Sequence, residues 1–200
     1  MLVLWAVAGY GALHSLLASR PIKEEVARRF GQSASRLYRL GYNIVGLVTL
    51  LPVLALPILL PDHILYVIPL PWVLLTVGVQ LASMGLVFLA VRQTDAWEFL
   101  GLRQLFGGER TGPPPLIETG LYRWVRHPAY AAGLLIIWLL PRMSTNFLAL
   151  DAGLTAYLWI GSLLEERKLV QEFGRAYRAY QRRVPRLLPR PWTNHPPDRG

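Results

Sequence analysis

The stretch LPWVLLTVGVQLASMGLVFLAV, residues 70–91, contains no Asp, Glu, Lys or Arg. A helix of about 20 apolar residues is long enough to cross the roughly 30 Å hydrocarbon core of a bilayer. Residues 40–60 are also apolar and free of these charged residues. The two segments therefore predict a chain that is embedded in a membrane by helices.

Three further apolar runs predict additional membrane helices. Residues 1–18 nearly reach the required length, 129–140 is short, and 147–164 is apolar except for Asp151. A cleaved signal peptide is disfavoured at the start because no basic region precedes the apolar run. The last two runs are expected to form a hairpin joined by residues 141–146. The fold class predicted is all-α, with about five transmembrane helices.

The positive charge of the chain follows a topological pattern. The net charge is +9, and six, five and nine of the 21 Lys and Arg residues lie in 20–39, in 92–126 and from 167 onward. Basic loops stay on the cytoplasmic side of a membrane. We therefore expect an outside N-terminus and a cytoplasmic C-terminus, in a bacterial inner membrane. The distribution of the arginines argues against nucleic acid as a ligand, because they follow the membrane topology rather than a soluble domain.

The chain divides into two regions in this interpretation. Residues 1–91 form an N-terminal three-helix membrane region, and residues 92–200 carry the polar motifs. Charge mixed with apolar residues predicts an interfacial helix at 20–39, and 92–128 reads as an interfacial helix followed by a loop. Beyond residue 164 a helix is expected to leave the membrane, and the proline-rich tail from Pro185 is expected to be extended and frayed.

A cationic motif, RWVRHPAY, begins the fourth predicted span. Proline is favoured in the first turn of a helix, so Pro128 predicts that His127 lies near the N-cap. Helix N-termini carry partial positive charge, which Arg123 and Arg126 would reinforce as a receptor for a carboxylate or phosphate. The alternative is an ordinary positively charged flank.

Two carboxylates, Glu165 and Glu166, end the fifth predicted span. Adjacent helical residues point about 100° apart, so one can face the bundle while the other pairs with Arg167 or Lys168. Solvated side chains at a membrane edge are the alternative. An anion receptor beside carboxylates suits a zwitterionic ligand, such as an amino-acid moiety with a nearby cationic centre.

Taken together, these motifs resemble a known family. GLYRWVRHPAYAAG at 120–133, EERKL at 165–169 and FGRAYRAY at 173–180 are similar to the signature of integral-membrane methyltransferases, the isoprenylcysteine carboxyl methyltransferase and phospholipid methyltransferase superfamily. A three-part motif at this spacing is more specific than any one part. The chain departs from many relatives in having Ala132 before Gly133.

Other stretches resemble one branch of that superfamily. They are similar to the NnrU and methanethiol S-methyltransferase branch, and comprise LHSLLAS at 13–19, YRLGYN at 38–43, DAWEFLGLRQL at 95–105 and LPRMST at 140–145. The resemblance implies S-adenosylmethionine as methyl donor, bound on the cytoplasmic side between the last two membrane helices and the C-terminal helix. It implies no metal.

The resemblance also implies roles for individual residues. Glu165, Glu166 and Arg126 would lie at the transfer site, and Glu166 would also contact the amino-acid end of the cofactor. The remaining cofactor-binding residues implied are His127, Tyr130, Gly120, Tyr122, Arg123, Tyr177 and Tyr180. Methyl transfer is an in-line displacement, so alignment and exclusion of water are the main tasks.

The expected function is methyl transfer to a lipophilic or small thiol-type acceptor, with isoprenylcysteine carboxylate, a thiol or a lipid all open. The lipid bilayer is the expected partner. The alternative is a non-catalytic NnrU-like membrane protein accessory to nitrogen-oxide respiration. Contacts of His14, Asp95 and Glu98 with substrate are also open, as is the glutamate that would act as base. Asp151 is expected to be structural, with Arg142 as its partner.

Overall fold

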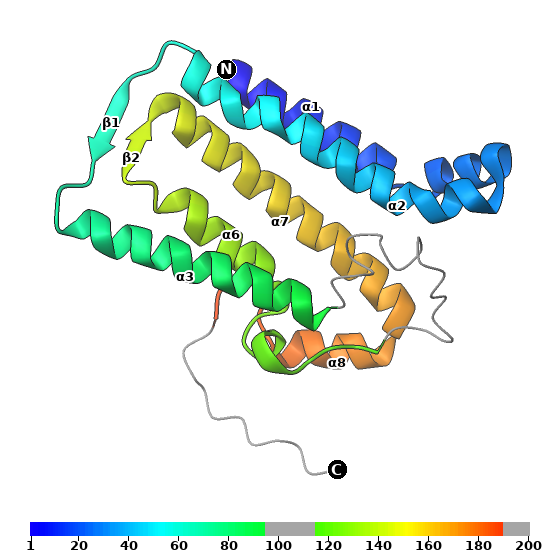
Figure 1. Cartoon of the computed structure of the whole chain (residues 1–200). Coiled ribbons are helices and arrows are strands. Elements are labelled where there is room, and N and C mark those ends of the chain that lie inside the picture. Colours follow the sequence, from blue (N-terminus) through cyan, green and yellow to red (C-terminus); the bar gives the residue numbers. More distant parts are fainter. Residues whose placement is uncertain (95–114, 190–200) are drawn as a thin grey trace.

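The computed structural model describes residues 1–94 and 115–189, except for the side chains of residues 32–36. Most of the described chain is helical (Figure 1). Asp95 and Glu98, with most of the predicted interfacial segment 92–128, lie outside the described residues.

The first two helices form an antiparallel pair of unequal length. Helix α1 is Leu2–Leu17 and helix α2 is Arg20–Leu59. Helix α2 is interrupted at Gly31, whose φ of 75° lies in the left-handed region that glycine tolerates. Its apolar part, Leu37–Leu59, agrees with the predicted second span. Its first part, Arg20–Gly31, bends by 54° from α1 and carries the predicted interfacial charges.

Three further helices match the other apolar runs of the sequence. Helix α3 is Trp72–Gln93, α6 is Pro128–Trp138 and α7 is Thr145–Phe173. Among the described residues, three helices are long and apolar enough to cross a membrane, or up to four if α1 and Arg20–Gly31 count as one bent span. Helix α6, with 11 residues, falls short of that length.

A short sheet, which the sequence interpretation missed, joins two of the loops. Strand β1, Ile64–Val67, pairs antiparallel with β2, Arg142–Ser144. The all-α prediction therefore holds for most of the chain but not for these loops. The sheet places β2 between α6 and α7, where a plain hairpin loop was expected.

Asp62 attaches this sheet to the start of α7. Its Oδ1 accepts hydrogen bonds from Thr145 Oγ1 at 2.7 Å and from the Asn146 amide at 3.0 Å. Desolvation raises the pKa of the Asp62 carboxyl, but hydrogen bonds from Ser144, Thr145, Asn146 and His63 outweigh it and lower the pKa to about 2.

Replacing Asp62 with Ala is expected to lower the melting temperature. Because the folded-state pKa is depressed, the contribution of Asp62 is complete above the ordinary value and is lost as pH falls from about 4 towards 2. Thermal melting in detergent should show the same difference between wild type and Asp62→Ala at pH 7 and pH 5, and a smaller one below pH 4. A difference that already shrinks at pH 5 would contradict this role.

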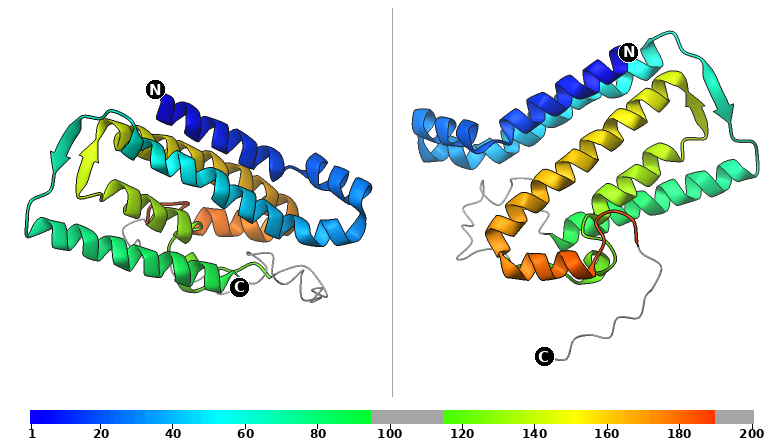
Figure 2. Two further views of the ribbon diagram at one scale, coloured as in Figure 1. Left: turned by 45° about the horizontal axis from the view of Figure 1, so that its top comes forward. Right: turned by 180° about the vertical axis from the view of Figure 1, so that it is seen from behind.

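The helices form two groups that meet along α7. Helix α1 packs on α2 and α7, whereas α3 packs mainly on α6 (Figures 1 and 2). The first group has a small core of Val3, Val7, Val53 and Leu150. A Cβ on Gly153 would lie 3.1 Å from Val7, so glycine permits the close approach of α1 and α7. The contacts of α1 with α7 therefore join the two predicted regions, residues 1–91 and 92–200.

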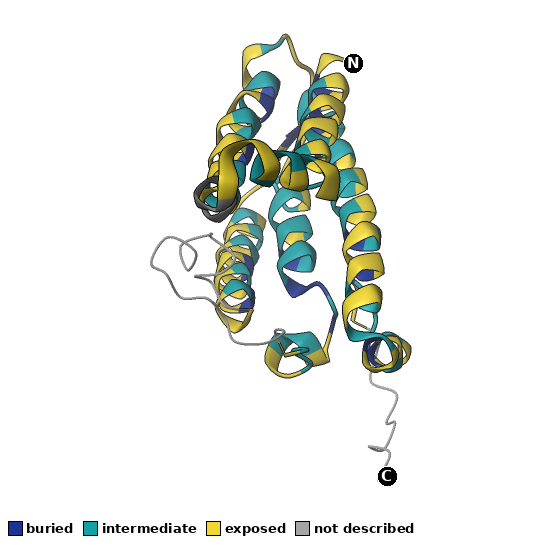
Figure 3. Cartoon of the chain, turned by 90° about the vertical axis from the view of Figure 1, so that its right-hand side faces the viewer, coloured by how far each residue is buried: buried dark blue, intermediate teal, exposed yellow. Residues whose placement is uncertain are grey.

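The outer surface of the helices is apolar. Large hydrophobic side chains such as Leu47, Leu74 and Phe88 are exposed, and exposed positions run along the whole length of the helices (Figure 3). Between 11% and 17% of each candidate span is buried inside the chain. Such a continuous apolar surface is incompatible with water and indicates contact with lipid.

The chain turns at Gly174 after α7. This residue has a φ of 57°, and helix α8, Arg175–Arg183, follows at an angle. A helix that leaves the membrane beyond residue 164 was predicted, but the break at Gly174 was not expected. Helix α8 lies at the opposite end of the bundle from the N-terminus and the sheet (Figure 1).

Candidate functional site

The motif residues meet where α6 begins, α7 ends and the chain returns after α8. His127 is the N-cap of α6 and Pro128 occupies its first turn, as the sequence predicted. The amides of Arg126 and His127 donate to the carbonyls of Pro185 and Arg186, at 2.9 and 3.0 Å. The prediction of a frayed tail is therefore wrong for Pro185 and Arg186, because these backbone bonds hold the segment against α6.

A buried ion pair joins α6 to α7. Arg126 Nε donates to Glu166 Oε1 at 2.7 Å, and the side chains of Arg126 and Glu166 are only 8% and 7% exposed. Arg126 also donates to the carbonyls of Gln181 and Val184. The guanidinium thus links three segments of the chain. It is neutralised by Glu166 instead of facing an open anion site.

Two residues of the C-terminal segment complete the surroundings of Glu166. Gln181 Nε2 donates to Glu166 Oε2 at 3.0 Å, and Arg186 Nε lies 3.5 Å from the same oxygen. The Arg186 guanidinium stacks over Trp159 at 5.1 Å from the ring centre. Its Nε and Nη1 are buried and make no hydrogen bond with the described residues.

His127 lies between the two glutamates. Its Nε2 is 3.4 Å from Glu166 Oε1, and its Nδ1 is 3.6 Å from Glu165 Oε2. Tyr130 stacks on the imidazole, with ring centres 5.3 Å apart, and donates from its hydroxyl to Glu165 Oε2 at 3.0 Å. Glu166 therefore faces inward, and Glu165, 48% exposed, turns towards Tyr130. The two carboxylates point in different directions, as predicted, but Glu165 contacts Tyr130 instead of Arg167 or Lys168.

The imidazole of His127 is favoured in its neutral form. Burial lowers the pKa of His127, and the nearby Arg126 adds to this, whereas Glu165 and Glu166 oppose it. Nε2 is buried and has no hydrogen-bond partner among the described residues. A buried polar atom without a partner is rare and is a candidate ligand contact.

Three tyrosines lie beside the site, Tyr177 and Tyr180 on α8 and Tyr122 in the loop before α6. Tyr180 donates from its hydroxyl to the carbonyl of Tyr122 at 2.6 Å, and Tyr122 donates to the carbonyl of Ala90 at 3.4 Å. Burial raises the pKa of the Tyr177, Tyr180 and Tyr122 hydroxyls, which therefore remain protonated donors. The Tyr177 hydroxyl is buried and unpartnered within the described chain.

The loop before α6 contains η1, Gly120–Arg123. Gly120 has a φ of 63°, and an added Cβ would lie 2.2 Å from the Gln93 side chain. Gln93 Oε1 accepts from the Leu121 amide at 3.2 Å, which joins the loop to the end of α3. Arg123 is exposed and stacks over Trp124, so the structure does not bring it to the ion pair.

Gly120→Ala is expected to destabilise the protein by about 1–2 kcal/mol, because a Cβ strains left-handed backbone and displaces Gln93. Gly133→Ala is the matched control, since an added Cβ there meets nothing within 4 Å. Alanine also favours the helix at that position. Thermal melting of both variants in detergent measures the difference. Equal losses of stability in Gly120→Ala and Gly133→Ala would contradict the prediction that the left-handed backbone of Gly120 requires glycine.

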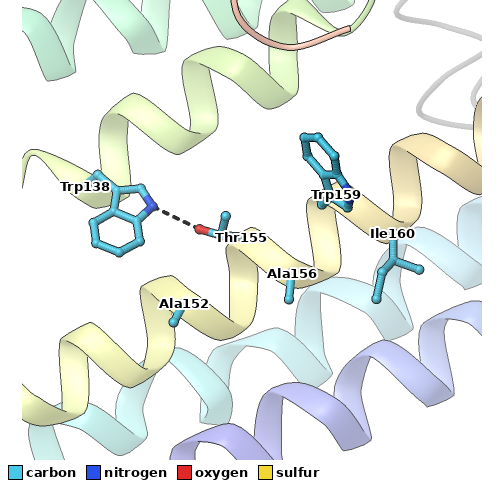
Figure 4. Close-up of a pocket in the computed structure, with 6 residues that line it drawn as sticks. All are labelled: Trp138, Ala152, Thr155, Ala156, Trp159 and Ile160. Carbon is cyan, nitrogen blue, oxygen red and sulfur yellow. Dashed lines mark hydrogen bonds between the residues drawn. The ribbon is translucent and has the colours of Figure 1, made fainter.

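An apolar groove separates α6 from α7 on the membrane side of the ion pair. It has a volume of about 510 Å³ and is lined by Trp138 of α6 and by Ala152, Thr155, Ala156, Trp159 and Ile160 of α7. Trp138 Nε1 donates to Thr155 Oγ1 at 2.9 Å across the groove (Figure 4). Trp159, which also stacks on Arg186, connects the groove to the charged residues.

Two other polar residues of the membrane helices, His14 and Asp151, lie apart from the charged residues around Glu166. His14 bonds to tyrosines of α2 and α7, at 2.9 Å from Tyr42 and 2.7 Å from Tyr157. Asp151 is 1% exposed, and neither carboxyl oxygen has a hydrogen-bond partner in the described chain. The predicted pairing of Asp151 with Arg142 is therefore wrong, because Arg142 is held in β2 opposite Val67.

Gln181 and Arg186 were not singled out from the sequence. Gln181 lies four residues after Tyr177 on α8, so its helical spacing could have placed it on the inward face. Arg186 is one of nine basic residues after position 166, and charge alone does not distinguish it. Its position depends on the backbone pairing with Arg126 and His127, which has no local sequence signal.

Comparison with known proteins supports the resemblance seen in the motifs. A family model described as "Protein of unknown function (DUF1295)" matches residues 24–184. Methanethiol S-methyltransferase 2 of Bradyrhizobium diazoefficiens is 37% identical over 123 residues, 58% of this chain and 46% of that protein. The Mycobacterium tuberculosis methanethiol S-methyltransferase is 38% identical over 100 residues, 48% of this chain and 40% of that protein.

A longer match has lower identity. Nurim of Bos taurus is 28% identical over 191 residues, 89% of this chain and 69% of that protein. The matches to the methyltransferases cover less than half of their length. No solved structure matches the chain.

Proposed function

Because the chain belongs to the family described as DUF1295 and resembles methanethiol S-methyltransferases over about half of its length, we propose that it is an S-adenosylmethionine-dependent membrane methyltransferase with a thiol acceptor. The observation that carries the proposal is the junction of α6, α7 and the returning C-terminal segment. There, Arg126 and Glu166 form a buried ion pair. Polar atoms of Arg186 and His127 without hydrogen bonds, and the half-exposed carboxylate of Glu165, could then bind a ligand.

These residues fit the proposed methyl donor. Its amino-acid end has a carboxylate, which matches Arg186, whose Nη1 has no hydrogen-bond partner in the described chain and whose Nε lies 3.5 Å from Glu166 Oε2. Its ammonium and sulfonium are cationic, which matches the half-exposed carboxylate of Glu165. The donor would supply an electrophilic methyl group. Arg123, exposed and stacked over Trp124, fits less well with the predicted contact.

The remaining site residues would position and shield the ligand. Arg126 and Glu166 hold α6, α7 and the C-terminal segment in register, and Tyr180 and Tyr122 hold the loop at η1. His127, kept neutral by burial, can donate or accept one hydrogen bond at Nε2 without adding charge. The role of the chain is therefore alignment and exclusion of water.

The acceptor would enter from the bilayer. The groove between Trp138 and Trp159 opens between α6 and α7 and is almost entirely apolar (Figure 4). A small or lipophilic thiol partitions into such a groove more readily than a charged metabolite. A lipid or prenylcysteine acceptor would use the same route. Comparing the methylation rates of a thiol, a lipid and a prenylcysteine tests the proposed thiol, which should react fastest.

We further infer five membrane crossings, with the site at the cytoplasmic face of a bacterial inner membrane. α1 and α6 would be the two crossings below the usual length. Helix α6 has half as many residues as α3 beside it, 11 against 22. Reactivity of single cysteines introduced at the exposed His63 and at the exposed Arg178 with a membrane-impermeant reagent tests this orientation.

Calorimetry with the detergent-purified protein tests the proposed cofactor. Saturable binding of S-adenosylmethionine and of its demethylated product is expected, with Arg186→Leu weakening both. Arg182→Leu is the matched control, because Arg182 is an exposed arginine of α8. Absence of binding at millimolar ligand by folded protein would favour the non-catalytic NnrU-like alternative.

A further inference from the structure

The apolar groove between α6 and α7 is bounded by a tryptophan at each end. Trp138, the last residue of α6, and Trp159 of α7 flank it, and the small side chains of Thr155 and Ala156 lie between them (Figure 4). The lining on α7 extends from residue 152 to residue 160, which corresponds to about 12 Å along the helix. The groove is therefore elongated along α7.

The hydrogen-bonding groups at the Trp138 end are already used. Trp138 Nε1 donates to Thr155 Oγ1 at 2.9 Å, and Thr155 Oγ1 donates to the carbonyl of Asp151 at 2.6 Å. Thr155 carries the only hydroxyl among the six lining residues. The bond to Thr155 also fixes the orientation of the Trp138 indole. This end of the groove therefore favours hydrocarbon over a polar group and has a fixed wall.

Trp159 connects the other end of the groove to the candidate cofactor site. The centre of its ring lies 5.1 Å from the Arg186 guanidinium, and Arg186 Nε lies 3.5 Å from Glu166 Oε2. Trp159 and Glu166 are seven residues apart on α7, so they share one face of the helix at a separation of about 10 Å. A molecule lying in the groove would therefore have one end beside the charged residues and the other against Trp138.

The groove is larger than a very small acceptor requires. At about 30 Å³ for each water-sized group, its volume of about 510 Å³ holds roughly 17 such groups. An extended chain advances about 3.5 Å for every three bonds, so about 12 Å of groove matches a chain of roughly ten carbons. A one-carbon thiol would contact only a small part of this lining. The dimensions therefore indicate an acceptor with a hydrocarbon chain.

We propose that the groove binds the hydrocarbon chain of a linear alkanethiol of roughly ten carbons, and that Trp138, held by Thr155, sets the longest chain accepted. The proposal rests on the methyltransferase function proposed above and specifies its acceptor. The thiol sulfur lies at the Trp159 end, next to Arg186, and the methyl end of the chain lies against the Trp138 indole. Trp138 thus determines specificity and takes no part in the chemistry.

Methylation of linear alkanethiols from butanethiol to hexadecanethiol in lipid nanodiscs tests this length limit. In wild type, the rate should fall about tenfold or more from decanethiol to hexadecanethiol, because one methylene too many in a hydrophobic pocket costs roughly 10–200-fold. Trp138→Ala should raise the ratio of the hexadecanethiol rate to the decanethiol rate about tenfold. Comparing this ratio between proteins in the same lipid cancels the partitioning of the thiols. Trp72→Ala, which removes an exposed tryptophan of α3 outside the groove, is the matched control and should leave the ratio as in wild type.

Ala156→Leu provides a second variant, which fills the middle of the groove instead of opening its end. It should lower the ratio of the decanethiol rate to the butanethiol rate about tenfold. Calorimetric binding of S-adenosylmethionine shows that each variant is folded. An unchanged ratio in either folded variant, as expected if the groove holds only a lipid acyl chain, would overturn the proposal. Absence of donor binding by wild type, or of methylation with every thiol, would instead refute the proposed function, so the two failures are distinguishable.

Discussion

Glu166→Ala is expected to reduce the free energy of unfolding by about 3–5 kcal/mol, the usual cost of removing one partner of a buried ion pair. The Arg126 side chain, 8% exposed, would lose its only counter-ion within 4 Å in the described chain, and Arg186 would lose its nearest carboxylate. Gln181 would also lose an acceptor. The loss should appear as a lower melting temperature in detergent.

Glu165→Ala is the matched control for this prediction. It removes the same side chain one position earlier on α7, but Glu165 is 48% exposed and its hydrogen-bond donor is Tyr130. We expect a loss of no more than about 1 kcal/mol, as for other exposed polar contacts. Glu166→Gln, which keeps the shape but not the charge, should lie between the two. Similar melting temperatures for Glu166→Ala and Glu165→Ala would show that the buried pair does not hold the three segments together.

His127→Ala is expected to weaken S-adenosylmethionine binding about 10–100-fold while leaving the fold intact. A hydrogen bond to a charged ligand contributes about 1.5–3 kcal/mol, and about 1.4 kcal/mol corresponds to a factor of ten in affinity. The His127 side chain makes no capping hydrogen bond, so α6 does not depend on it to begin. Calorimetry gives the affinity and thermal melting gives the stability of the same sample.

Tyr130→Phe distinguishes the contribution of the His127 imidazole to affinity from that of the neighbouring Tyr130 hydroxyl. The phenyl ring keeps the stacking on His127 but loses the hydrogen bond to Glu165. The loss of affinity should be smaller than for His127→Ala. Normal affinity in His127→Ala would remove His127 from the cofactor site and return the RHP motif to a structural role.

The membrane character of the fold was predictable from the sequence because long apolar runs have few alternatives in a folded protein. The uncharged runs at 40–60 and 70–91 correspond to the second part of α2 and to α3, respectively. The sheet was not predicted because β1 and β2 have four and three residues. Strands this short, next to prolines and turns, have no clear period.

The candidate site was predictable where the signal is local. Pro128 in the first turn identified the helix start at His127, and one helical step of about 100° separated the directions of Glu165 and Glu166. Arg126 was expected to face an anion, but the structure pairs it with Glu166. The contribution of Arg186 depends on a chain reversal after α8, which no local pattern indicates.

Transfer of a labelled methyl group is the most direct test of whether this chain is a methyltransferase. Purified protein in lipid nanodiscs is incubated with methyl-labelled S-adenosylmethionine and a small alkanethiol, and labelled thioether is measured, with His127→Ala alongside. We expect labelled thioether in an amount that depends on protein concentration and is reduced in His127→Ala. No labelled product from any thiol, lipid or prenylcysteine acceptor, with folded protein and saturating donor, would contradict the assignment of this chain as a methyltransferase.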